Sequence, residues 1–107
     1  MFIPLPVVMH TAEALPVGEM RALRAGDREV LLARLDDGYH VVDDTCTHER
    51  CSLGDGWLED GVVECPCHGA TFDIRTGAAL TLPATKPLRV YPVRTTPDGA
   101  LEIEVPA

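Results

Sequence analysis

The stretch CPCHGATFD, residues Cys65–Asp73, places two cysteines and a histidine within four positions. The chain has four cysteines in 107 residues, and the other two lie in CTHERC, residues Cys46–Cys51, which also contains His48. Thiolate sulfur and imidazole nitrogen are the donors that zinc and some iron–sulfur centres take. Sixteen residues separate His48 from Cys65, enough for the two clusters to fold back onto one metal centre.

The spacing alone leaves the kind of metal centre open. Cys-x-His followed by Cys-x-x-His supplies two sulfurs and two nitrogens, which also suits a structural, tetrahedral zinc ion. A catalytic zinc would need an open coordination position and a nearby general base, and nothing in the sequence points to them. Nucleophilic catalysis by one cysteine–histidine pair would leave the second pair unexplained.

Length and charge narrow the class of protein. A chain of 107 residues predicts a single domain with a modest core. Its 17 acidic and nine basic residues give a net charge of -8, which argues against nucleic acid and an anionic membrane surface as partners. The acidity serves solubility, or it favours docking onto a basic patch of a partner protein.

Both ends of the chain predict antiparallel sheet. Short runs rich in β-formers alternate with Gly-Asp, Asp-Asp-Gly and Pro-Asp-Gly turn signals. In the last run, apolar and charged residues alternate, as in a strand with one buried face. The expected strands are Glu19–Ala25, Arg28–Leu35, Tyr39–Val42, Leu88–Thr95 and Ala100–Val105.

The first ten residues, MFIPLPVVMH, are apolar but interrupted by Pro4 and Pro6. They have no basic start and predict an edge strand, where proline is tolerated, and neither a signal peptide nor a membrane span. We therefore expect a cytoplasmic protein. Residues Thr11–Leu15 predict one helical turn capped by Thr11.

The middle of the chain, from about residue 44 to 84, is rich in glycine, cysteine and acids. Short strands are expected at Gly61–Glu64 and Ala70–Asp73. The predicted fold class is all-β, with an antiparallel β-sandwich or barrel base from residues 1–43 and 85–107. The middle is expected to form a small inserted subdomain that holds the metal centre on loops.

The motif resembles the signature of Rieske [2Fe–2S] proteins, and the likeness extends to His68-Gly69, Phe72-Asp73, Thr76-Gly77 and the region of Pro83. It covers essentially the whole chain and is closest to the small bacterial ferredoxins of ring-hydroxylating oxygenases. The resemblance implies an all-β Rieske fold and one [2Fe–2S] cluster. The implied ligands are Cys46 and Cys65 on the inner iron, and His48 and His68 on the outer iron.

The resemblance also suggests a role for the remaining cysteines. In cytochrome bc-complex members of the family, cysteines at the positions of Cys51 and Cys67 form a disulfide, so we expect one here. The alternative is two buried thiols in a reducing cytosol. High-potential members carry serine and tyrosine where this chain has Ala70 and Phe72. Without those hydroxyls we expect a low potential for a Rieske centre.

Other conspicuous residues have simpler interpretations. His10 and His40 are expected to be surface or strand residues without a role, and Trp57 is expected to pack as core beneath the cluster loops. Leu82-Pro83-Ala84 resembles the loop that covers the cluster in the family. Glu49 and Arg50 are the best candidates to touch a partner. The acids of this region form either a solvated loop surface or a docking surface: Asp43, Asp44, Glu49, Asp55, Glu59, Asp60 and Glu64.

The resemblance implies a soluble one-electron carrier, monomeric and not itself an enzyme. It would accept electrons from a flavin- or NAD(P)H-dependent reductase and pass them to a terminal oxygenase. Two alternatives remain open at this point. One is a Rieske-like small subunit of a nitrite reductase or other oxidoreductase complex, and the other is a structural zinc-binding interaction module.

Overall fold

The computed structural model describes residues 1–8, 15–47, 50–67, 69–82, 86–97 and 99–105. Within these ranges the regular structure is all-β apart from one short 3-10 helix. The elements are β1 (Phe2–Val8), β2 (Met20–Ala25), β3 (Arg28–Leu35), β4 (Gly38–Asp43), η1 (Leu53–Asp55), β5 (Trp57–Glu59), β6 (Val62–Glu64), β7 (Thr71–Asp73), β8 (Val90–Tyr91), β9 (Val93–Thr95) and β10 (Ala100–Glu104).

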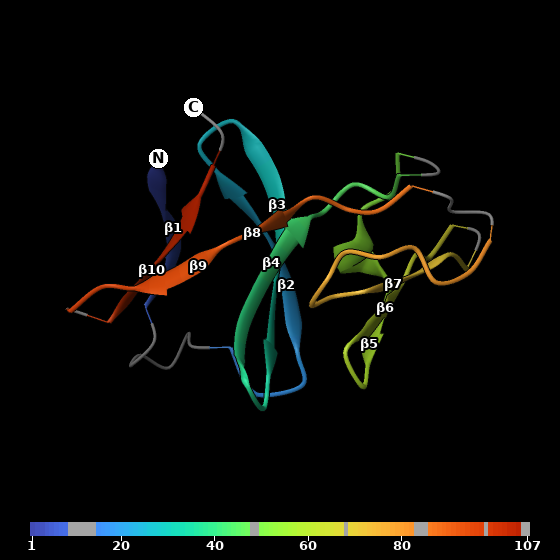
Figure 1. The fold of residues 1–107 in the computed structure, drawn as a ribbon, viewed down its shortest axis with the longest axis horizontal. Coiled ribbons are helices and arrows are strands. Elements are labelled where there is room, and N and C mark those ends of the chain that lie inside the picture. The colour runs from blue at the N-terminus through green and yellow to red at the C-terminus, as the bar shows by residue number, and fades with distance from the viewer. Residues whose placement is uncertain (9–14, 48–49, 68, 83–85, 98, 106–107) are drawn as a thin grey trace.

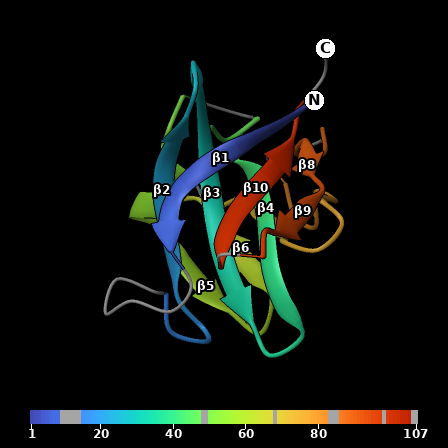
Figure 2. The same cartoon turned by 90° about the vertical axis from the view of Figure 1, so that its left-hand side faces the viewer.

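The strands form three antiparallel sheets, in the orders β1-β10-β9, β2-β3-β4-β8 and β5-β6-β7. Figure 2 shows β1 and β10 lying across the face of the central sheet that contains β3 and β4. The third and smallest sheet lies at the other end of the molecule, beside the loops that follow β4 and β7 (Figure 1). The all-β fold expected from the sequence is confirmed.

The central strand β3 is buried on both faces over most of its length, which explains its nearly continuous apolar run. Its residues Val30 and Leu32 pack with Leu101 and Ile103 of β10 in one core. The intervening Leu31, together with Ala33 and Leu35, packs in a second core with side chains of the third sheet. Because successive side chains point to opposite faces, β3 joins the base of the molecule to its cysteine-rich end.

The expected elements are largely confirmed, with differences that have physical causes. The strand at Arg28–Leu35 has the predicted bounds, and β1 is an edge strand. The run expected as one strand at Leu88–Thr95 is two strands that join different sheets on either side of Pro92, which has no N–H to donate. Most of the helical turn predicted at Thr11–Leu15 lies outside the described residues.

In the part of the chain that the structure describes, no helix has the length and apolar character required to cross a membrane.

Candidate metal centre

Two loops, each closed by a backbone hydrogen bond, carry the cysteine and histidine clusters noted in the sequence. The Cys46 N–H donates to the Cys51 carbonyl at 3.0 Å, and the Cys65 N–H donates to the Ala70 carbonyl at 2.8 Å. Each hydrogen bond closes a loop whose first residue is a cysteine and whose last lies five residues further on. His48 and His68 belong to these two loops by sequence but lie outside the described residues.

The cysteines that begin the loops are buried in one core. The exposed fraction is 4% for Cys46 and 2% for Cys65, and both pack with Leu53 and Phe72. Neither takes part in a disulfide. Buried thiols at the start of two similarly closed loops are sulfur donors shielded from water, which is the setting an iron–sulfur cluster requires.

A disulfide joins the two loops, as expected from the resemblance. Cys51 and Cys67 are bonded, with their Cα atoms 6.4 Å apart. Cys51 is half-buried against the core that contains Cys46 and Cys65, whereas Cys67 is exposed. The crosslink therefore joins the last residue of the Cys46 loop to the third residue of the Cys65 loop, on the solvent side.

A buried carboxylate organises the loop that contains Cys46. Asp44 is 4% exposed and accepts hydrogen bonds from Ser52 Oγ at 2.5 Å and from the Gly54 N–H at 2.9 Å. The Leu53 N–H also donates to the Asp44 carbonyl, at 2.7 Å. From the sequence, Asp44 was assigned to a solvated or docking surface of acids. This prediction is wrong, because its carboxylate accepts hydrogen bonds inside the loop.

The segment between β7 and β8 is hydrogen-bonded to the loop of Cys46. Thr47 Oγ1 donates to the Lys86 carbonyl at 2.8 Å, so the loop of Cys46 is tied to the chain just before β8. Leu80 and Leu82 are 49% and 78% exposed. Leu82 begins the segment expected to cover the cluster, and the following Pro83 and Ala84 lie outside the described residues.

Trp57 was expected in the core, and this prediction is wrong. It is 61% exposed on β5, the edge strand of the third sheet. Its neighbour Leu58 points to the core instead, since alternate side chains of a strand face opposite sides. The scarcity of aromatic residues does not indicate which face of β5 carries the ring.

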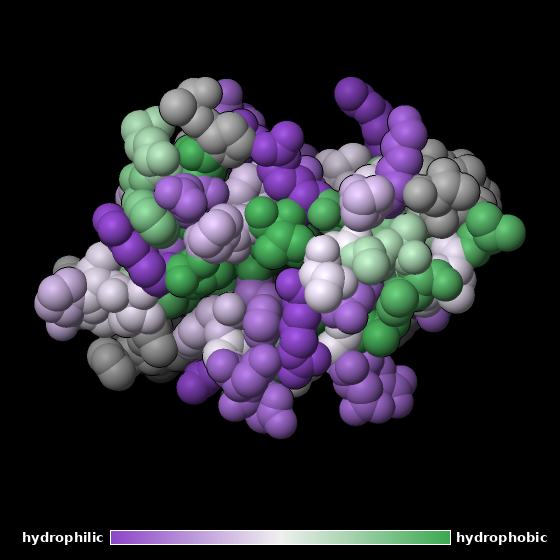
Figure 3. Space-filling view, in the orientation of Figure 1, coloured by the Kyte–Doolittle hydropathy of each residue, from purple (hydrophilic) through white to green (hydrophobic). Residues whose placement is uncertain are grey.

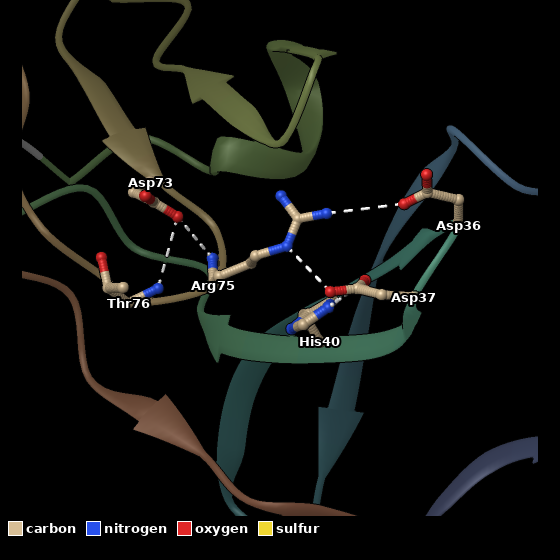
Figure 4. A network of polar contacts seen from close by, with 6 residues as sticks. All are labelled: Asp36, Asp37, His40, Asp73, Arg75 and Thr76. Carbon is tan, nitrogen blue, oxygen red and sulfur yellow. Dashed lines mark hydrogen bonds and ion pairs between the residues drawn. The ribbon is translucent and has the colours of Figure 1, made fainter.

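An ionic cluster joins the cysteine-rich end to the central sheet. Arg75, just after β7, donates from Nε to Asp37 Oδ2 at 2.9 Å (Figure 4). Its Nη2 lies 3.6 Å from Asp36 Oδ1. Asp37 Oδ1 in turn pairs with His40 Nε2 at 2.8 Å. Asp73 Oδ1 accepts the backbone N–H of Arg75 at 2.8 Å and fixes the turn from which the guanidinium extends. No local sequence pattern indicates this contact, because its partners lie 38 positions apart.

The ionic cluster predicts a pH dependence of stability. The hydrogen bond from Arg75, reinforced by that from His40, lowers the pKa of Asp37 from 3.8 to about 2. A carboxyl whose pKa falls on folding stabilises the native state above its unfolded pKa, and this contribution is lost as the pH falls towards 2. Asp37→Asn should therefore lower the free energy of unfolding at pH 7.

The measurement is urea unfolding of both proteins from pH 7 down to the lowest pH at which both stay folded. The difference between them should shrink below pH 4, and a difference that grows on acidification would contradict the assignment. Asp27→Asn is the matched control, because Asp27 is an exposed turn residue for which no ion pair is found in the described part of the chain.

Comparison with known proteins identifies the family. The model of the Rieske [2Fe–2S] domain matches residues 5–92. The chain is 45% identical over 96 residues to the 3-phenylpropionate/cinnamic acid dioxygenase ferredoxin subunit of Photorhabdus laumondii, covering 89% of this chain and 90% of the relative. It is 42% identical over 87 residues to the anthranilate 1,2-dioxygenase ferredoxin subunit of Burkholderia cepacia, covering 81% and 80%.

A solved structure shows the same likeness in three dimensions. A chain in the complex of reduced oxygenase and oxidized ferredoxin of carbazole 1,9a-dioxygenase matches with a TM-score of 0.79 and 32% identity, over 92% of this chain and 100% of that one. Two buried thiols outside the disulfide, each opening one of the joined loops, fit the sulfur half of the ligand set that this family uses. The chain belongs to the Rieske [2Fe–2S] family and carries one cluster of that type.

Proposed function

We propose that this chain is the ferredoxin component of a ring-hydroxylating oxygenase system, and that Cys46, His48, Cys65 and His68 hold its cluster. The cluster takes up and gives back one electron, which it carries from a flavin- or NAD(P)H-dependent reductase to a terminal oxygenase. The chain is an electron carrier and not itself an enzyme. The relatives that support this role are ferredoxin subunits of dioxygenases.

The observation that carries the proposal is the paired burial of Cys46 and Cys65 at the start of two matching loops. Thiolates at these positions suit the inner iron. We assign the imidazoles of His48 and His68 to the outer iron. Two imidazoles in place of two thiolates raise the potential of such a centre above that of an all-cysteine cluster. On this assignment, His48 and His68 are the route by which an electron leaves.

The surface around the loops suits a brief encounter with a partner. Figure 3 shows apolar side chains gathered at the end of the molecule that carries the loops, and Leu80 and Leu82 are exposed there. Arg50 is exposed next to the disulfide. Electron-transfer complexes use small interfaces, so that a carrier can leave one partner and reach the next.

We extend the proposal to the organisation of the chain into a base and a cluster-binding subdomain. Residues 1–43 and 85–107 form the base of a single domain, and residues of about 44–84 form the subdomain that binds the cluster. We expect a monomer in the cytoplasm. Size-exclusion chromatography and cell fractionation would test these two statements directly.

The test of the proposed function is a spectroelectrochemical titration of the purified protein. We expect one reversible step with the slope of a one-electron reaction, and a spectrum that returns fully over repeated cycles. A protein that shows no reversible one-electron step would contradict a role as an electron carrier.

The same titration tests an expectation about the potential. Ala70 and Phe72 are 1% and 0% exposed in the core that holds Cys65, and neither has a hydroxyl to donate to cluster or ligand sulfur. We therefore expect a potential towards the lower end of the range of about -150 to +300 mV known for Rieske centres. Ala70→Ser and Phe72→Tyr should each raise it, because a donated hydrogen bond stabilises the more negative reduced state.

Ala78→Ser is the control, since Ala78 is only half-buried and belongs to the turn after β7. The reduction potential of the Ala78→Ser variant should equal that of the unchanged protein. A fall in potential in Ala70→Ser would show that the added hydroxyl does not act on the sulfur charge.

A further inference from the structure

Three cysteine sulfurs meet beside the metal centre. The Sγ atoms of Cys51, Cys65 and Cys67 all lie within 4.8 Å of one another. Two of them, from Cys51 and Cys67, form the disulfide, and the third is a thiol outside it. Exchange between a thiol and a disulfide requires a sulfur nucleophile next to the S–S bond, and Cys65 stands in that position.

We infer that the disulfide moves when no cluster is bound: Cys65 displaces Cys67 and pairs with Cys51. The inference rests on the proposed role of Cys65 as a cluster ligand. In this step the Cys65 sulfur bonds to the Cys51 sulfur while the Cys51–Cys67 bond breaks. The proton that leaves the Cys65 thiol ends on the Cys67 thiol, and no electrons are gained or lost, so no oxidant or reductant is required.

The surroundings of the sulfurs determine which bond forms. Cys51 packs against the buried core that contains Cys65, so these two residues already share one environment. Cys67 is exposed, and a sulfur that departs there is hydrated as it leaves. A bond from Cys65 to Cys67 would instead close a very small ring through Pro66 alone. The geometry thus favours Cys51–Cys65 as the product and an exposed thiol at Cys67.

The exchange couples the disulfide to the state of the metal centre. In the protein with its cluster, the Cys65 sulfur is engaged and the Cys51–Cys67 bond persists. After exchange, Cys65 is blocked, and the chain lacks one of the two thiolates that the cluster needs. A dithiol that reduces the new disulfide restores both cysteines, so cluster assembly in the rearranged chain depends on the thiol pool of the cell.

The experiment compares two full-length variants, each of which removes one proposed thiolate ligand. Cys46→Ser keeps all three sulfurs of the exchange, and Cys65→Ser removes the nucleophile. Each protein is kept anaerobic without added thiol, quenched in acid, unfolded and alkylated with N-ethylmaleimide. Cleavage after glutamate at Glu59 and Glu64 separates Cys51 from Cys65 and Cys67, and tandem mass spectrometry then locates the label and the disulfide.

The inference predicts that Cys67 carries the label and Cys65 is protected in Cys46→Ser. Labelling of Cys67 should be at least tenfold lower in Cys65→Ser and in the unchanged protein with its cluster. The unchanged protein stripped of iron by a chelator should behave like Cys46→Ser, which covers the case in which that variant does not fold. Circular dichroism reports the fold of each sample.

An intact Cys51–Cys67 bond with a labelled Cys65, in both Cys46→Ser and the stripped protein, would overturn the inference. That result would leave the proposed function untouched, because the unchanged protein would still show its iron and its visible spectrum. Failure of the proposed function would appear instead as an unchanged protein without iron, whatever the disulfide pattern.

Discussion

Cys46→Ser is expected to lose the cluster almost completely, with iron falling from about two atoms per chain to near zero. The reason is that Cys46 supplies one of two buried thiolates, and a serine hydroxyl is a poor donor to iron in a cluster. Cys65→Ser should have the same effect. The measurement is iron content together with visible absorption of freshly purified protein.

The matched control removes the disulfide and leaves both proposed thiolates. The double variant Cys51→Ser, Cys67→Ser should keep its iron but lose about 3 kcal/mol of stability, as expected for a crosslink that closes a loop of this size. Cys51, Cys65 and Cys67 could form a three-sulfur metal site only if the disulfide were reduced, and this control also decides between that ligand set and the proposed one. Loss of iron in the double variant, with iron retained in Cys46→Ser, would reverse the assignment.

Gly56→Ala is expected to destabilise the protein by about 3 kcal/mol or more. A Cβ at Gly56 would lie 1.9 Å from the Glu64 carbonyl oxygen and 3.1 Å from Pro66 Cδ. These atoms flank Cys65 on both sides, and backbone cannot move aside as the end of a flexible side chain can. The clash should therefore open the loop of Cys65 and weaken cluster retention as well.

Chemical unfolding and the rate of iron loss to a chelator measure the two effects. Gly18→Ala is the control, since its Cβ would meet no atom within 4 Å and only the positive φ of +90° resists the change. That variant should lose about 1 kcal/mol and keep its cluster. Equal cluster retention in Gly56→Ala and the unchanged protein would show that close packing under the Cys65 loop does not support the centre.

The sequence predicted those strands and loops whose residues lie close together along the chain. The run Arg28–Leu35 reads as a strand because a valine and three leucines recur in it between two turns that contain glycine. The cysteine–histidine motif indicated the metal centre because the cysteine and histidine of each cluster lie within a few consecutive residues. The disulfide followed from the resemblance rather than from the spacing, and the structure confirms it.

What the sequence did not predict depends on contacts between distant segments. Asp44 looked like one more surface acid, and only the folded loop shows that Ser52 and Gly54 enclose its carboxylate. Arg75 meets Asp37 across the join between two sheets. Trp57 sits on an edge strand of three residues, where no periodic pattern is long enough to assign its face.

The most direct test of the central claim is an EPR spectrum of the dithionite-reduced protein, with iron and zinc quantified in the same sample. We expect about two irons per chain, negligible zinc and a signal whose average g value is typical of mixed histidine and cysteine ligation. That result would establish a Rieske cluster in this chain. A colourless protein with stoichiometric zinc and no EPR signal after reduction would contradict the account.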